Sequence, residues 1–129
     1  MAIATDRAPE IIWVEVPPKL SAPDLDRILG ELEGYLRRQR PYYLLFDLRE
    51  SLPDAMQRKK LTDHMRDHQV AIERWVLGLG VVVPSAVARK LMTAIMWFAP
   101  PKMPHRICAD RGEAEAWVRA LKVTTARET

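Results

Sequence analysis

Four short apolar runs recur along this 129-residue chain, and each leads into a segment with helical spacing. The runs are Ile11–Val16, Tyr43–Leu48, Val76–Val83 and His105–Ala109, and their starts lie roughly thirty residues apart. A short apolar run, a polar turn and an amphipathic helix make a βα unit, and successive units build a mostly parallel sheet. The sequence therefore predicts an α/β fold: a single small, mostly parallel sheet of about four strands with helices packed on it.

The segments between and after the runs repeat apolar residues at helical intervals. The first helix is expected over about Ala22–Gln39, the second over about Pro53–Trp75, and the last after Asp110. Side chains that cap helix N-termini stand at the expected starts: Ser21 with Asp24, Ser51 with Asp54, Ser85, and Asp110 with Glu113.

The helix expected between Pro84 and Pro100 is the most apolar of the four. Its core stripe is predicted to be Val87, Leu91, Ala94, Ile95 and Phe98, which leaves Met92, Met96 and Trp97 on the flank beside Arg89 and Lys90. Exposed Met and Trp beside basic residues suit a partner surface or the lip of a lipid pocket. Buried, they would instead cover the end of the sheet, and the sequence leaves both alternatives open.

Length and composition indicate one globular domain. We expect a flexible N-terminal arm over residues 1–10, the domain over 11–122 and a C-terminal tail over 123–129. Net charge is +3 with the charges interleaved, so no nucleic-acid partner is expected. The chain shows neither a signal-peptide pattern nor an apolar run of about 20 residues, which predicts a cytoplasmic protein without a membrane span.

No arrangement of catalytic side chains stands out. The serines are explained as caps, and Cys108 lies in a strand that directs His105 to the opposite face. His64 and His68 have the spacing of a zinc pair, but the sequence suggests no third ligand. No phosphate-binding glycine motif is present, and Gly78-x-Gly80 inside a strand favours close approach of a helix. We expect no enzymatic activity, no cofactor and no metal ion.

In open parallel sheets, ligands bind beyond the carboxyl ends of the strands. The polar residues expected at that edge have mixed charge, so they form either internal ion pairs or a site for an anionic group: Asp47, Arg49, Glu50, Asp54, Arg89, Asp110 and Arg111.

Three segments, YLLFDLRE, WVLGLGVVVPSAVARKLMTAIMWFAPPKMPHRICAD and EAEAWVRAL, resemble the bacterial SpoIIAA-like domains of the STAS superfamily. These domains are related in fold to the lipid-binding lobe of CRAL-TRIO proteins. The resemblance covers roughly Glu10–Leu121 and implies a parallel or mixed sheet with strand order 2-1-3-4. Two departures matter. Ala55 follows Asp54 where antagonists of anti-sigma factors carry a phosphorylatable serine, and only Ala2–Thr5 could supply the family's additional first strand.

The leading hypothesis is a non-enzymatic SpoIIAA-like module that binds a protein partner, is regulatory and self-associates as a homo-oligomer. The alternative is a carrier or sensor of a lipid or another apolar small molecule, with a pocket between the third helix and the sheet. An enzyme would need a cleft around Asp47 or His105. The residues expected to bind the partner or ligand are Arg49, Glu50, Ser51, Asp54, Arg89, Met92, Met96 and Trp97.

Overall fold

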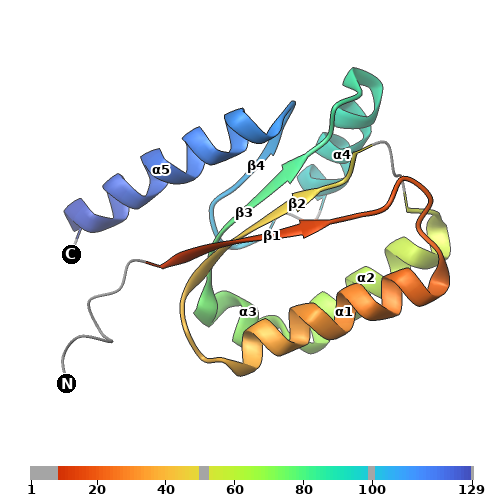
Figure 1. The fold of residues 1–129 in the computed structure, drawn as a ribbon, viewed down its shortest axis with the longest axis horizontal. Coiled ribbons are helices and arrows are strands. Elements are labelled where there is room, and N and C mark those ends of the chain that lie inside the picture. The colour runs from red at the N-terminus through yellow and green to blue at the C-terminus, as the bar shows by residue number, and fades with distance from the viewer. Residues whose placement is uncertain (1–8, 50–52, 99–100, 129) are drawn as a thin grey trace.

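The computed structural model describes residues 9–49, 53–98 and 101–128, and within them the predicted α/β architecture is confirmed (Figure 1). Four parallel strands form one sheet in this part of the chain. The elements are, in chain order, β1 (Glu10–Glu15), α1 (Ala22–Arg37), β2 (Tyr42–Asp47), α2 (Ala55–Asp67), α3 (Gln69–Trp75), β3 (Val76–Val82), α4 (Ala86–Phe98), β4 (His105–Cys108) and α5 (Arg111–Glu128).

The strand order is β1-β2-β3-β4, so the order 2-1-3-4 implied by the resemblance is wrong. Each strand pairs in register with the next one along the chain, as in Ile12 with Leu44, Leu44 with Leu79, and Leu79 with His105. Parallel crossovers are right-handed, so connections that all step in the same direction place their helices on one face. This order therefore puts α1 to α4 on one face and makes β1 and β4 the edges of the described sheet.

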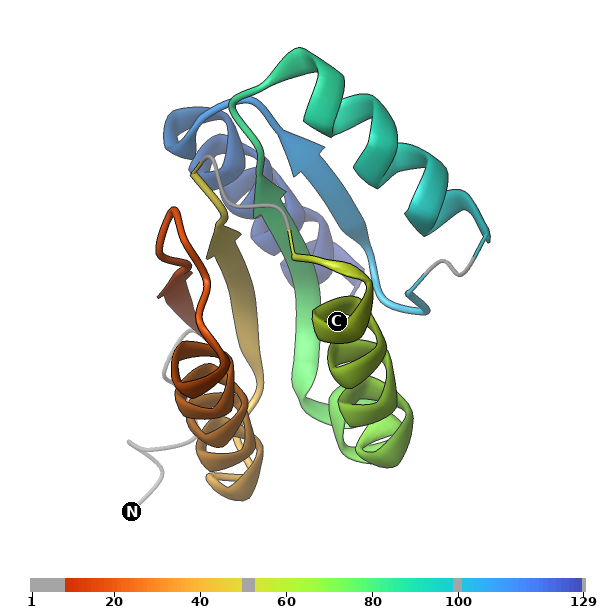
Figure 2. The ribbon, with the colours of Figure 1, turned by 90° about the vertical axis from the view of Figure 1, so that its right-hand side faces the viewer.

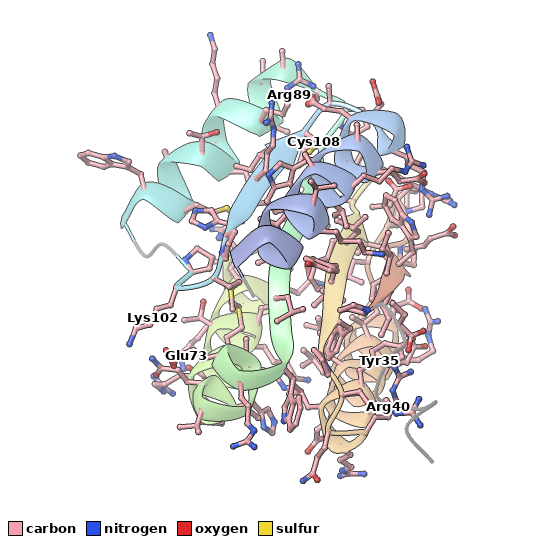
Figure 3. The ribbon with its side chains drawn as sticks, turned by 90° about the vertical axis from the view of Figure 1, so that its left-hand side faces the viewer. Tyr35, Arg40, Glu73, Arg89, Lys102 and Cys108 are labelled. Carbon is pink, nitrogen blue, oxygen red and sulfur yellow. The ribbon has the colours of Figure 1, made fainter. Side chains whose placement is uncertain are left out.

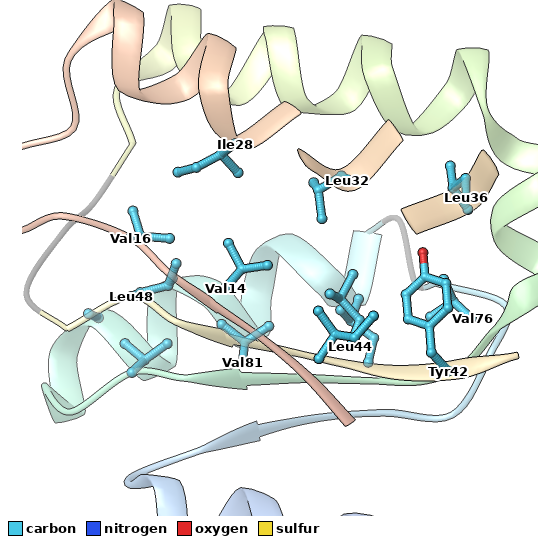
Figure 4. Close-up of a cluster of buried hydrophobic side chains, with 14 residues drawn as sticks. Val14, Val16, Ile28, Leu32, Leu36, Tyr42, Leu44, Leu48, Val76 and Val81 are labelled. Atoms are coloured by element: carbon cyan, nitrogen blue, oxygen red, sulfur yellow. The ribbon is translucent and has the colours of Figure 1, made fainter. Parts of the chain in front are cut away.

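The larger core lies between the sheet and helices α1, α3 and α4. Ile28, Leu32 and Leu36 of α1 stand above Val14 and Leu44 of the strands (Figure 4). The helical residues are four apart and the strand residues alternate, so each element directs one apolar row into the same layer. This core contains most of the buried apolar residues of the described chain and packs β1, β2 and β3 against the helices.

The second core lies on the opposite face, which α5 covers alone among the described helices (Figure 2). Ala114 and Val118 of α5 are fully buried against Tyr43 and Leu45 of β2. The helix comes this close because β3 has glycine beneath it: a Cβ on Gly78 would stand 2.7 Å from the Cδ2 atom of Leu121. The predicted role of the glycines in close helix approach is confirmed.

Helix boundaries agree with the predicted caps at three starts and differ at one. The capping box of Ser21 and Asp24 is formed, and Ser85 and Asp110 also accept bonds from the first turns of their helices. The second helix starts after Asp54, which forms a full capping box with Gln57, so the box predicted from Ser51 is wrong. The predicted single helix over 53–75 is divided at His68 into α2 and α3, and α5 continues to Glu128.

Candidate interaction surface

Helix α4 turns a small apolar row inward. Ala88 is buried in the larger core, and Met92 and Met96 are half-buried against it. These residues are four apart and so share one face. A small Ala near the start of the helix permits close approach to the sheet, and unbranched Met side chains fill the irregular space that remains.

The outward side of α4 is apolar as well. Val87 and Trp97 are each 79% exposed and Leu91 is 50% exposed, while Ala94 is exposed between them. The core stripe predicted through Val87, Leu91 and Ala94 is therefore wrong at these positions; the predicted members Ile95 and Phe98 have side chains outside the described set. The cause is the composition of the helix: it is apolar around most of its circumference, so spacing alone does not select the buried face.

Strand β4 lies beside α4, and a groove of about 450 Å³ that is open to solvent runs between them. Thr93, Met96 and Trp97 line it from α4, and His105, Arg106 and Ile107 line it from β4. Nδ1 of His105 lies 3.1 Å from the carbonyl oxygen of Met103, and this hydrogen-bonding contact orients the imidazole at the start of β4. We use the name α4–β4 surface for this groove together with the exposed outer side of α4. Its members are Thr93, Met96, Trp97, His105, Arg106 and Ile107 in the groove, and Val87 and Leu91 on the outer side.

The charged residues at the carboxyl ends of β1 and β2 form a closed network. Arg111 places its guanidinium 3.3 Å from Glu15 and 3.3 Å from Asp47, and stacks 4.1 Å above the ring of Trp13. Arg49 donates to Glu15 at 3.1 Å, and its backbone N–H donates to Asp47. Of the two alternatives for this edge, the structure supports internal ion pairs, because each of these arginines already faces a carboxylate.

The remaining predicted site residues do not gather with the α4–β4 surface. Arg89 curls back to donate to the carbonyl oxygens of Val83 and Pro84 at 2.9 and 2.7 Å, which holds the start of α4 against the end of β3 (Figure 3). Asp54 caps α2. Glu50 and Ser51 lie outside the described residues. Of the eight residues expected in the site, Met96 and Trp97 line the groove, and Met92 lies on the core side of the same helix.

Reactive side chains elsewhere are accounted for by packing. Cys108 is fully buried in the smaller core, and this burial raises the pKa of its thiol. The rings of His64 and His68 lie 4.4 Å apart, and Nε2 of His68 is 3.8 Å from Glu33. Within the described residues, no group of three His, Cys, Asp or Glu side chains is arranged to hold a metal ion.

Four of the six groove residues were missed because their importance depends on which side of β4 is open. His105, Arg106 and Ile107 read as an ordinary short strand, and Thr93 as a polar residue in a helix. A compositional signal was present: the chain from Val76 to Ala109 contains no Asp or Glu but has four Lys or Arg residues, Arg89, Lys90, Lys102 and Arg106. A segment of one charge sign beside apolar exposed residues indicates a surface with a preferred partner.

These features define a small α/β domain with an all-parallel sheet and one apolar outer helix. The family model of the SpoIIAA-like domains matches residues 11–119, so the chain belongs to the SpoIIAA-like, STAS-related family. Domains of this family are typically non-enzymatic, are commonly regulatory and usually act in protein–protein interactions. No curated protein and no solved structure matches the chain. No helix among the described residues is long and apolar enough to span a bilayer.

Proposed function

We propose that this protein is a non-enzymatic, regulatory interaction module that binds a partner protein through the α4–β4 surface. The observation that carries the proposal is the outward face of α4, where Val87, Leu91 and Trp97 are exposed together. Several large apolar residues exposed on one helix mark interaction sites more often than scattered single ones do. Family membership supports the same kind of function.

The composition of the surface fits a protein contact. Exposed Trp and half-buried Met are side chains that carry a large share of binding energy when a partner covers them. Lys90 and Arg106 are exposed at the border of the surface, which provides the polar rim that such contacts have. The predicted loop Arg49–Asp54 supplies less, because Arg49 and Asp54 are already engaged within the domain.

The alternative, a carrier of an apolar small molecule, needs a pocket between α4 and the sheet. Ala88, Met92 and Met96 pack into that space against the larger core. The groove beside β4 is open to solvent, whereas small-molecule sites enclose most of their ligand. These observations favour a protein partner over a carrier function.

The experiment is site-specific photo-crosslinking in the cells that produce the protein. A photoreactive amino acid replaces Leu91 on the surface or, as the matched control, Met56 on α2, which is 83% exposed. We expect a discrete protein adduct from position 91 that is absent from position 56. Absence of an adduct at 91, or the same adducts from both positions, contradicts the proposal.

Self-association is a narrower form of the proposal and has its own measurement. Sedimentation velocity of the purified chain over a range of concentrations would detect a dimer. If the chain is a monomer at all concentrations, the homo-oligomer is rejected. An adduct at position 91 with a protein other than this chain would still support the interaction module.

A further inference from the structure

The outer side of β4 presents backbone groups that the described sheet does not use. The N–H groups of Leu79 and Val83 in and after β3 donate to the carbonyl oxygens of Pro104 and Cys108, at 2.9 and 2.8 Å. In a parallel ladder, alternate residues bond to the same neighbour. The even-numbered residues of β4 therefore face β3, and the N–H and C=O groups of His105 and Ile107 point away from the sheet.

The groove runs along this open side of the strand. Consecutive strand residues direct their side chains to opposite faces, yet His105, Arg106 and Ile107 all line the groove. A groove that contacts three consecutive residues must lie at the edge of the strand, between its two faces. Its other wall is the C-terminal half of α4, where Thr93, Met96 and Trp97 stand.

The open edge has a defined end. Beyond β4, the N–H group of Ala109 donates to Oε1 of Glu113 at 3.3 Å, so a side chain of α5 occupies the next outward-facing position. An added strand beside β4 could therefore form backbone hydrogen bonds with His105 and Ile107 but not with Ala109. With so few backbone bonds available, the walls of the groove must supply the rest of the affinity.

Charge specifies the kind of strand that fits. Arg106 and Lys90 are exposed and form no ion pair with any carboxylate that the structure describes, and Lys102 pairs only with Glu73, at 3.4 Å (Figure 3). The chain from Val76 to Ala109 contributes no carboxylate of its own. A second copy paired edge to edge would bring two Arg106 side chains together, and like charges on adjacent strands are unfavourable. An acidic strand would be attracted instead.

We propose that β4 receives an extended segment of a partner protein, with alternating apolar and acidic side chains, as an additional strand of the sheet. The apolar side chains would contact Met96, Trp97 and Ile107, and the acidic ones, on the opposite face of the added strand, would face Arg106. Addition of a strand to an exposed edge is a recurring mode of peptide recognition, in which the backbone gives affinity and the side chains give selectivity. This inference rests on the proposed function and names its partner class.

The test uses the full chain labelled with ¹⁵N and a short peptide of alternating Val and Glu. Amide hydrogen exchange is followed residue by residue, with the same peptide carrying Lys in place of Glu as the control. We expect the acidic peptide to slow exchange at His105 and Ile107. The amides of Arg106 and Cys108 already face β3 and should change little. The Lys peptide should have no effect.

Charge reversal sharpens the test. Arg106→Glu should weaken binding of the acidic peptide by about tenfold, as rim charges at an interface can, and should allow the Lys peptide to bind. Arg37→Glu on α1 makes the same change in net charge far from the groove and should leave both affinities unaltered.

Three results would overturn the inference: no slowing at His105 and Ile107 at saturating peptide, equal binding of the Lys peptide, or slowing that grows with protein concentration in the absence of peptide. The last would identify a second copy as the occupant. If an adduct forms at position 91 but the peptide does not slow amide exchange in β4, the proposed interaction module is retained and only the added strand is rejected.

Discussion

Helices α1 and α4 lie on the same face of the sheet, yet they use their apolar residues in opposite ways. Helix α1 buries Leu25, Ile28, Leu32 and Leu36 in one row and exposes its charged residues. Helix α4 buries Ala88 and half-buries two Met residues, while Val87, Leu91 and Trp97 remain exposed. The domain needs the apolar row of α1 to form its core, but it does not need the outer side of α4.

The difference separates residues that stabilise the fold from residues available for binding. Burial of a Leu side chain contributes about 1.5–3 kcal/mol to folding, whereas an exposed one contributes little until a partner covers it. Substitutions in α1 should therefore reduce the stability of the domain, and those on the outer side of α4 should reduce binding. The predictions below test that division.

The largest loss of stability is expected for Leu32→Ala in α1. Leu32 is 8% exposed and lies between Ile28 and Leu36 in the larger core, so truncation removes apolar contacts and leaves a cavity. We expect the free energy of unfolding to fall by about 2–5 kcal/mol, measured by urea denaturation. A loss below about 1 kcal/mol would mean that α1 is not packed more tightly than α4.

An intermediate loss of stability is expected in the smaller core, and it is tested by comparing two Gly→Ala substitutions. A Cβ on Gly80 of β3 would collide with the fully buried Leu45 side chain and contact Trp117 of α5, so Gly80→Ala should cost about 1–3 kcal/mol. Gly34→Ala in α1 is the matched control. A Cβ there meets nothing within 4 Å, so the same substitution should stabilise by about 0.4–1 kcal/mol. The opposite signs are measured in the same denaturation experiment, and equal signs would contradict the tight packing of Leu45 over Gly80.

Helix α2 gives a weaker effect that depends on pH. It has no buried residue, and its Lys60 forms an ion pair with Asp26 of α1. Within it, burial lowers the pKa of His64 below its ordinary value of 6.5, helped by the neighbouring His68, and its Nε2 atom has no hydrogen-bond partner among the described residues.

A lowered pKa means that the unfolded chain binds a proton at His64 more readily than the folded one does. Above the ordinary value of 6.5 the group contributes nothing to pH dependence; as pH falls from there toward the lowered pKa, stability is lost. We expect His64→Gln to flatten the curve of unfolding free energy against pH between about 6.5 and 5, a window in which unperturbed carboxylates stay mostly ionised. An unchanged slope in the variant would assign the effect to another group.

The contrast between the helices also explains what could be predicted from the sequence. The strands and α1 follow from local patterns, since alternating or continuous apolar runs and a single stripe such as Leu25–Leu36 allow one arrangement. Helix α4 has apolar residues around most of its circumference, so its inward face is determined by the fit of Ala88 and two Met residues against the sheet. That choice depends on contacts with residues far away in the sequence.

The groove could not be predicted from the sequence, for a related reason. It brings Thr93 of α4 together with His105 of β4, and it exists because β4 lies at an edge of the described sheet. Strand order is not encoded in any one segment, and the order implied by resemblance was wrong. The ion pairs of Arg111 with Glu15 and Asp47 likewise depend on where α5 begins on the sheet, which no local pattern specifies. The acid-free composition from Val76 to Ala109 was visible, but without the fold it did not identify a surface.

The smallest effect on stability is expected on the outer side of α4, and it is the most informative one. Leu91→Gln replaces a half-exposed apolar side chain by one of similar length with comparable helix propensity, so the free energy of unfolding should stay within about 0.5 kcal/mol of the unaltered protein. Trp97→Ala should also leave the fold intact, and both variants should lose the partner adduct when the photoreactive residue is placed at Val87 instead. If either variant unfolds the domain as Leu32→Ala does, α4 contributes to the core in the same way as α1 and has no apolar surface left for a partner. If both remain folded and still yield the adduct at Val87, the side chains of Leu91 and Trp97 do not contribute to partner binding.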